Sequence, residues 1–424
     1  MLLAACLHRF TNQLGSLPIH LSSKPLEILV DGLRDIDRDC FHILASIYAN
    51  HTAVKFSARM AKKDSGFIEP NSPEVTAQGR VAFRIHAPKA TSVSLGPIGD
   101  LASLGIGVGL PFKKGSDGVW TLTLQRVPPG AHRYQFTVDG LTILDPRNPR
   151  TSESNEHAWS LVNVPGAPWM EPGPDTPRGS ISALPYWSTV RGRFRRLHVY
   201  TPPGYDGGRG RFPVLYLLHG AFDSDNSWST VGRAADILDT LIAAGQVRPM
   251  VVVMPHGHVG PFQLGMPMWG EFEPEFLQDI QPFVEARFRI RSHRRGRALA
   301  GLSMGGGHTL NLGFAEPNLF SHLGVFSSGI FDPKGLPHLT EAPIVEFERR
   351  HQKVLTSPIR RRGFPELWFA TGQRDFLLGV TRSTVDFLRK HDFSVTYHET
   401  EGGHTWDRWR DYLRQFLPLL FPKG

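Results

Sequence analysis

The chain has only two cysteines among its 424 residues, and both of them, Cys6 and Cys40, lie in the first tenth of the sequence. The remainder therefore needs no disulfide and no metal site built from thiolates. Long hydrophobic runs are also missing, because no apolar stretch reaches the roughly 18 residues that a membrane-spanning helix requires. The longest runs, at 213–218 and 250–254, have the length of buried strands. We therefore expect no membrane partner.

Acidic residues are fewer than basic ones. The sequence has 39 Asp and Glu against 47 Lys and Arg, which gives a net charge of +8. Arginines gather within 193–196, 291–297 and 360–362. This pattern favours a solvated basic surface, with attraction to an acidic polymer such as a glucuronate-bearing polysaccharide as the alternative. No nucleic-acid-binding motif accompanies the charge, so we expect no nucleic-acid partner.

Residues 1–70 lack the turn residues that would organise them into a recognisable unit. A secretory signal needs a basic start and then about 7–15 apolar residues, whereas the apolar stretch 1–7 is short and has no charge before it. The stretch 3–6 looks like a lipoprotein cleavage box, but the hydrophobic segment that should precede it is missing. We expect a poorly integrated segment, with Met60 as an alternative start, and a cytoplasmic protein unless the true start differs.

Residues 71–150 have the pattern of a small all-β sandwich. Polar and apolar residues alternate at 81–85, as they do in a strand with one buried face. The Asp-Gly dipeptides at 117–118 and 139–140 are strong turn signals between such strands. Short strands at regular spacing predict a sandwich rather than a helical domain.

Three stretches of this region, 83–90, 118–120 and 134–140, carry a resemblance. They are similar to the early-set, immunoglobulin-like sandwich found beside glycogen-branching and related enzymes. Some relatives of that domain bind α-glucans, so the resemblance implies a carbohydrate-binding module. However, Trp120 occupies an alternating strand position that favours the core over a sugar-stacking surface. A structural or substrate-orienting role is the default expectation.

The composition changes twice after the β-rich region. Residues 151–179 are rich in Pro, Gly, Ser and Glu, which predicts a linker. Across 180–424, apolar strand-like stretches alternate with helical stretches. Such alternation predicts an α/β domain with a mostly parallel sheet flanked by helices.

A candidate nucleophile lies in this second domain. The sequence 301–305, Gly-Leu-Ser-Met-Gly, matches the pattern G-x-S-x-G, with Ser303 at its centre. The pentapeptide alone is a weak signal, but a short strand at 297–300 precedes it and a helical run follows it. A sharp strand-to-helix turn needs glycines on both sides of the serine, and it lifts the hydroxyl above the edge of the sheet. We predict that Ser303 is the nucleophile.

Two further residues complete a catalytic triad in the prediction. Asp375 follows a strand-like stretch at 366–369, and His404 lies in a glycine-rich loop before the last helix. The order Ser, then Asp, then His is that of α/β-hydrolases. We predict Asp375 as the acid and His404 as the base. The alternatives are a helix cap for the aspartate and a surface or packing role for the histidine.

The predicted mechanism also needs two backbone N–H donors for an oxyanion. Met304, directly after the nucleophile, should supply one of them. The loop after the strand-like stretch 214–218 should supply the other, and we predict the N–H of Ala221. His219, in the same loop, is predicted to be structural rather than catalytic.

With these motifs in place, residues 180–420 resemble the esterase D-type family, which includes the feruloyl and acetylxylan esterases of carbohydrate esterase family one. Enterochelin-esterase-like proteins and mycobacterial mycolyltransferases are more distant kin. The resemblance implies an α/β-hydrolase fold and a serine carboxylic-ester hydrolase that works through an acyl-enzyme, without a metal or an organic cofactor. It rests on 217–220, 225–228, 249–257, 301–307, 371–375 and 402–404.

The resemblance leaves the substrate open. A feruloyl or acetyl ester of a plant polysaccharide is the leading expectation. A siderophore esterase and an acyltransferase are alternatives with the same triad, and an inactive carbohydrate-binding scaffold is the alternative from another class. The loops at 256–262, 266–272 and 331–362 are expected to shape the acyl pocket. The oligomeric state is not predicted.

Overall fold

The computed structural model describes residues 69–259, 272–330, 342–358 and 364–422. Both cysteines, Met60 and almost all of the predicted segment 1–70 lie outside the described residues, as do large parts of the loops expected to shape the acyl pocket. None of the helices within the described ranges has the length and apolarity that crossing a membrane would demand.

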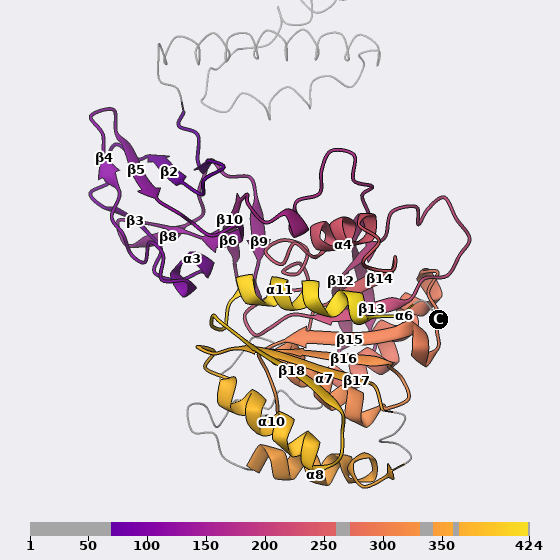
Figure 1. The fold of residues 1–424 in the computed structure, drawn as a ribbon. Coiled ribbons are helices and arrows are strands. Elements are labelled where there is room, and N and C mark those ends of the chain that lie inside the picture. Colours follow the sequence, from indigo (N-terminus) through magenta and orange to yellow (C-terminus); the bar gives the residue numbers. More distant parts are fainter. Residues whose placement is uncertain (1–68, 260–271, 331–341, 359–363, 423–424) are drawn as a thin grey trace, which may run out of the picture. The chain divides into compact units, whose positions relative to one another are not determined.

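One eight-stranded sheet forms the centre of the second domain, with the strand order β11-β12-β14-β13-β15-β16-β17-β18 (Figure 1). The first two strands and β14 pair antiparallel, and every pairing from β14 to β18 is parallel. This is an α/β-hydrolase-like fold, as predicted. The strands are β11 (Ser180–Ser188), β12 (Arg193–Thr201), β13 (Val214–Leu218), β14 (Val251–Pro255), β15 (Arg297–Leu302), β16 (His322–Phe326), β17 (Glu366–Gly372) and β18 (Val395–Thr400).

Helices cover both faces of this sheet, which explains why its central strands β13, β14, β15 and β16 are buried at every position and mostly apolar. Along β13, Leu215 and Leu217 pack on one side with α4 and α11, whereas Tyr216 and Leu218 pack on the other side with α6, α7, α8 and α10. The helices are α4 (Ala234–Ala243), α5 (Phe272–Glu275), the π-helical turn η2 (Phe276–Ile280), α6 (Gln281–Arg287), α7 (Met304–Ala315), α8 (Ala342–Leu355), α10 (Leu378–Lys390) and α11 (Trp406–Phe416).

The preceding part of the chain, residues 74–164, contains three small sheets and is called the β region below. Their orders are β1-β2-β5-β4, β3-β7-β8 and β6-β10-β9. Trp120 is buried in the common core with Phe83 and Phe136, as its alternating position predicts. The elements are β1 (Glu74–Val75), β2 (Val81–His86), β3 (Val93–Leu95), α3 (Asp100–Ser103), β4 (Lys113–Lys114), β5 (Val119–Leu124), β6 (Gly130–Tyr134), β7 (Phe136–Val138), β8 (Leu141–Ile143), β9 (Thr151–Glu153) and β10 (Ala158–Val164).

The prediction of a linker over 151–179 is wrong for its first half. The strands β9 and β10 lie inside this stretch, and β10 pairs with β6 over five residues. The prolines that suggested a linker begin only at Pro165, whereas 158–164 is a largely buried strand. Composition averaged over the whole stretch concealed this strand.

The sheet that contains β6 and β10 contributes side chains to two different cores, one on each of its faces. Val162 and Val164 belong to the core of the β region, whereas Leu161 and Ala131 pack into the core formed by α4 and α11. Arg410 of α11 reinforces this contact, since its Nη1 donates to the carbonyl of Ala131 at 3.0 Å. The β region and the hydrolase-like domain therefore share one continuous interface.

Candidate active site

Ser303 lies at the turn between β15 and α7, where the backbone adopts φ 49° and ψ −116°. The close packing of this turn explains the surrounding glycines. A Cβ on Gly301 would lie 2.3 Å from the carbonyl carbon of Gly305, and one on Gly305 would lie 2.6 Å from the carbonyl oxygen of His219. The N–H of Ser303 donates to the carbonyl of Phe326 on the neighbouring strand at 2.8 Å. The turn therefore holds the hydroxyl at the carboxyl edge of the sheet.

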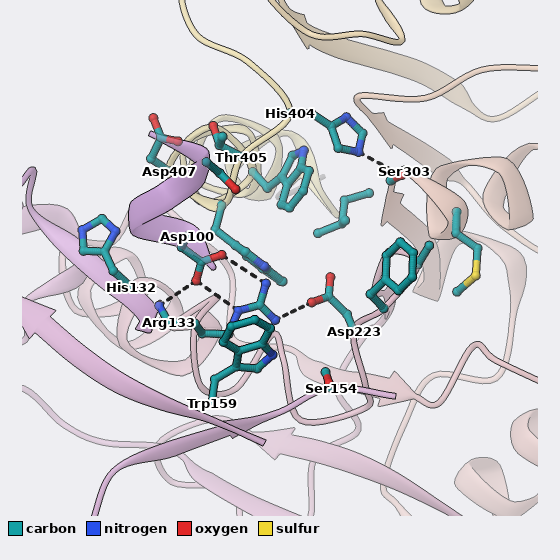
Figure 2. A pocket seen from close by; sticks show the side chains of 18 of the residues that line it. Asp100, His132, Arg133, Ser154, Trp159, Asp223, Ser303, His404, Thr405 and Asp407 are labelled. Carbon is teal, nitrogen blue, oxygen red and sulfur yellow. Dashed lines mark hydrogen bonds and ion pairs between the residues drawn. The ribbon is translucent and has the colours of Figure 1, made fainter. Parts of the chain in front are cut away.

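The structure brings the three predicted triad residues together. Figure 2 shows the contact between Ser303 and His404. Ser303 Oγ lies 3.0 Å from His404 Nε2. On the other side of the imidazole, His404 Nδ1 lies 2.9 Å and 3.1 Å from the two carboxylate oxygens of Asp375. Because the carboxylate can only accept, Nδ1 carries a proton, which leaves Nε2 of the neutral ring to accept from the serine hydroxyl.

The Asp375 carboxylate is fully buried and held by hydrogen bonds. The N–H of Leu377 donates to its Oδ1 at 2.8 Å. Burial raises the pKa of Asp375, but the hydrogen bond and charge of His404, with the Leu377 N–H, outweigh burial and hold that pKa below its usual value. The group therefore stays ionised at neutral pH. Asp375 is not the N-cap of the following helix, because α10 begins at Leu378 and its N-cap is Leu377.

Two residues around this triad were not found from the sequence. The side chain of Ser327 helps to lower the pKa of the Asp375 carboxylate through its polar hydroxyl. Trp409 of α11 donates from Nε1 to Ser327 Oγ at 2.9 Å, and its ring lies edge-on to His404 at 5.0 Å. Since the indole is only a donor, the Ser327 hydroxyl accepts from it and keeps its own proton for the carboxylate. No local pattern signals this relay, because its partners come from distant elements.

The predicted oxyanion donors line the same cavity as Ser303. Met304 opens α7, so its N–H belongs to the first turn and has no partner within the helix. Within the described part of the chain, neither this N–H nor that of Ala221 donates to another protein group. Gly220 brings its loop close to Ser303, since a Cβ there would meet Leu302 Cδ1 at 2.5 Å and Ser303 Cβ at 3.4 Å.

His219 is buried behind this loop and makes structural contacts. Its Nε2 accepts from the N–H of Gly257 at 2.8 Å. Nδ1 therefore carries the proton and donates to the carbonyl of Gly220 at 2.8 Å. Burial lowers the pKa of His219, so the ring stays neutral and keeps this tautomer. The position agrees with the predicted structural role.

Three more histidines surround His219. The rings of His256 and His258 each lie 5.4 Å from it, and burial lowers their pKa values to about 3 and about 2. His308 of α7 has a pKa lowered to about 3, again because it is buried. The described residues contain no group of three or more His, Cys, Asp or Glu side chains arranged to hold a metal ion. The cluster packs as neutral aromatic rings.

A cavity of about 350 Å³ opens at Ser303, and both parts of the molecule line it. The hydrolase-like domain supplies the loop 220–223, the elbow, Phe376 with Leu377, and the stretch from His404 to Trp409. The β region supplies side chains from α3 and the residue after it, from β6, from the turn between β9 and β10, and from β10. These are Asp100, Ser103, Leu104, His132, Arg133, Ser154, His157 and Trp159. No local pattern in the sequence indicated that side chains of the β region line the cavity at Ser303.

An ion cluster crosses the boundary between the two parts at this cavity (Figure 2). Arg133 of β6 pairs with Asp100 through Nε at 3.0 Å and with Asp223 through Nη1 at 2.7 Å. Burial lowers the pKa of Arg133, but the two carboxylates outweigh burial and raise it above its usual value. Asp223 belongs to the loop that carries Ala221, so this cluster ties that loop to the β region.

Comparison with known proteins agrees with this fold. A family model described as "Putative esterase" matches residues 188–420. An endo-1,4-beta-xylanase/feruloyl esterase of Xylanibacter ruminicola is 34% identical over 363 residues, which cover 82% of this chain and 46% of the relative. The chain thus spans about half the length of that relative. An acetyl esterase of Caldicellulosiruptor saccharolyticus is 28% identical and covers 47% of this chain and 80% of its own length.

Solved structures show the same fold. A ferulic acid esterase is 26% identical and covers 57% of this chain and 98% of its own, with a TM-score of 0.51. The enterobactin esterase of Shigella flexneri, at 18% identity and a TM-score of 0.57, covers 81% of this chain and 93% of its own. Because the family model spans more than half of the sequence, this chain belongs to the esterase family that the model describes.

Proposed function

We propose that the chain hydrolyses carboxylic esters through an acyl-enzyme on Ser303. The observation that carries this proposal is the continuous line of hydrogen bonds from Ser303 Oγ through His404 to Asp375, at 3.0 Å and 2.9 Å. Ser303 and His404 line the same cavity as Ala221 and Met304, whose N–H groups are the proposed oxyanion donors. These are the roles that acyl transfer requires: a nucleophile, a base with its orienting acid, and oxyanion donors.

In the proposed reaction, Ser303 Oγ attacks the ester carbonyl carbon while His404 Nε2 takes the hydroxyl proton. The carbonyl oxygen becomes an oxyanion held by the N–H groups of Ala221 and Met304. Collapse of this intermediate breaks the bond to the alcohol oxygen, which leaves with the proton from His404 Nε2. Water then repeats the sequence on the acyl-enzyme and releases the carboxylic acid. Asp375 keeps its charge and stabilises the imidazolium in both halves.

For the substrate, we propose a feruloyl or acetyl ester of a plant polysaccharide. The name of the Xylanibacter relative supports a feruloyl group, and the name of the Caldicellulosiruptor relative supports an acetyl group. Aromatic rings line the cavity, where Phe222 and Phe376 are both 62% exposed and Trp159 lies on the side of the β region. Exposed rings at the mouth of a cavity suit the stacking of an aromatic acyl group.

A siderophore ester is the second candidate, because the enterobactin esterase shares the fold over both parts of the chain. The charge of the cavity favours the neutral sugar ester. Asp100, Asp223 and Asp407 line it. Arg133 pairs with the first two and Arg408 pairs with Asp407 at 2.8 Å, so each guanidinium at the described lining is already engaged by a carboxylate. A ferric catecholate carries several negative charges, and like charges disfavour its approach.

The β region has the strand content expected of the early-set sandwich, and we propose that it belongs to this class. Its place beside the cavity supports the predicted substrate-orienting role rather than that of a remote carbohydrate-binding module.

The test is a substrate panel of methyl ferulate, acetylated xylan and a catecholate siderophore, run with the wild type and with Ser303→Ala. We expect hydrolysis of methyl ferulate or acetylated xylan, and a loss on the order of a million-fold in Ser303→Ala. Circular dichroism of the variant should match the wild type, because the hydroxyl makes no packing contact that the fold needs. Wild-type activity on none of the three substrates would overturn the proposal.

A further inference from the structure

The loop that carries Ala221 is held from several directions. Its first peptide is the one that matters, because the carbonyl of Gly220 and the N–H of Ala221 belong to the same peptide unit. In a trans peptide these two groups point in opposite directions. Fixing the direction of the Gly220 carbonyl therefore fixes the direction of the Ala221 N–H.

Two donors hold that carbonyl. His219 Nδ1 donates to it at 2.8 Å, and the N–H of Asp223 donates to it at 3.3 Å, which closes the turn 220–223. The second bond is long, and the turn contains Phe222 at a φ of 65°, a left-handed conformation that is unfavourable for a side chain of this size. The turn therefore depends on contacts from outside to keep its shape.

The β region supplies those contacts. The N–H of Asn155, in the turn between β9 and β10, donates to the carbonyl of Phe222 at 3.1 Å. Arg133 Nη1 pairs with the Asp223 carboxylate at 2.7 Å, while its Nε and Nη2 bind Asp100 at 3.0 Å and 3.1 Å. All three charged side chains are nearly buried, at 12%, 5% and 10% exposure for Arg133, Asp223 and Asp100. Water screens such a cluster little.

We propose that Arg133 is a positioning residue for the oxyanion hole, acting through Asp223 on the peptide that carries the Ala221 N–H. The inference rests on the proposed function and deepens it. It assigns to the β region a part in positioning the oxyanion donor, whichever ester is hydrolysed. A small substrate that cannot reach a polysaccharide-binding surface depends on it as much as a polymer does.

The test uses p-nitrophenyl acetate and a double-mutant cycle. Asp223→Ala cuts the link to the loop and leaves the pair of Arg133 with Asp100 intact, whereas Arg133→Gln cuts both. Loss of one oxyanion donor costs about 100- to 1000-fold in kcat, so misplacing it should cost about 10- to 100-fold, with KM within about twofold. The double variant should be little worse than either single one, because both remove the same link. Arg133→Lys, which keeps one charged donor, should recover part of the loss.

A matched control comes from the same interface. Arg196 of β12 pairs with Glu153 of β9 across it, without touching the loop 219–223. Glu153→Gln should keep kcat at the wild-type value, even if both this variant and Asp223→Ala lose some thermal stability. A purely structural role for Arg133 would make the two variants behave alike in kcat.

The inhibition constant of phenylboronic acid separates a positioning role of Arg133 from a purely structural one. The boronic acid forms a tetrahedral adduct on Ser303 with an oxygen in the oxyanion hole, so its inhibition constant should rise in parallel with the fall in kcat/KM across the variants. Unchanged kcat in Asp223→Ala and Arg133→Gln would overturn the proposal, as would a rise in KM alone or a loss seen only with acetylated xylan. An inactive wild type that does not bind the boronate would instead refute the proposed function itself.

Discussion

This protein should lose stability at pH values well above those at which its carboxylates titrate, because several histidines are buried as neutral rings. His351 of α8 is the best single probe. It packs between Phe314 and Phe347, is 5% exposed and lies outside the cavity at Ser303. Burial and the nearby charge of Arg350 lower its pKa from 6.5 to about 4.

Proton linkage gives the sign and size of the change in the free energy of unfolding with pH. Between pH 6.5 and about 4 the unfolded chain binds a proton at this site and the folded protein does not, so stability is complete above pH 6.5 and is lost as the pH falls. At about pH 5 the loss is 1.5 pH units at about 1.4 kcal/mol each, or about 2 kcal/mol for His351 alone. The lowered pKa values of His132 and His322, both about 4, add losses of the same kind. The total approaches the whole stability of a typical domain.

The assay is urea unfolding followed by tryptophan fluorescence at constant ionic strength, for the wild type and His351→Phe. The phenyl ring fills nearly the same space and cannot take a proton. The two proteins should differ little at about pH 7.5. At about pH 5 the variant should be more stable than the wild type by about 2 kcal/mol, with equal m-values. Equal loss of stability in both proteins would refute the reasoning, as would a wild type whose stability does not change between these pH values.

Four further outcomes are expected. His404→Ala and Asp375→Asn should each lose several orders of magnitude in kcat, and combining either with Ser303→Ala should cost little more, as measured with p-nitrophenyl acetate. Trp409→Phe keeps a ring against His404 and removes the donor to Ser327, so kcat should fall about fivefold to tenfold with KM unchanged. A variant with full kcat would contradict the relay. Deleting residues 1–59 should leave activity and Tm nearly unchanged, since no sequence pattern links that stretch to the rest, and a large drop in Tm would show that it packs against the body. Dialysis against EDTA should leave hydrolysis unchanged, because every group in the proposed mechanism belongs to the chain.

Local patterns were enough to predict the elements that carry Ser303, Asp375 and His404. Each of these residues lies within four residues of the carboxyl end of a strand, and the carboxyl ends of parallel strands meet at one edge of a sheet. The glycines around Ser303 and the apolar strand before it are adjacent in sequence, so the turn could be read directly. Their assignment as a catalytic triad stays a prediction that the experiments above test.

The contribution of the β region could not be predicted in the same way. Arg133 and Asp223 are separated by 90 residues, and neither lies in a motif that marks an ion pair. Trp409 and Ser327 are separated by 82 residues and come from different layers of the fold. Such pairs depend on how the layers pack, which a single sequence does not encode as a local period.

The central claim, an acyl-enzyme on Ser303, is tested most directly by covalent labelling. A fluorophosphonate should inactivate the enzyme with one adduct per chain, and mass spectrometry of the digest should place that adduct on the peptide containing Ser303. The same reagent should label the His404→Ala variant far more slowly, because the Ser303 hydroxyl then lacks its base. An adduct on another residue that accompanies the loss of activity, or full activity in the labelled protein, would contradict the account.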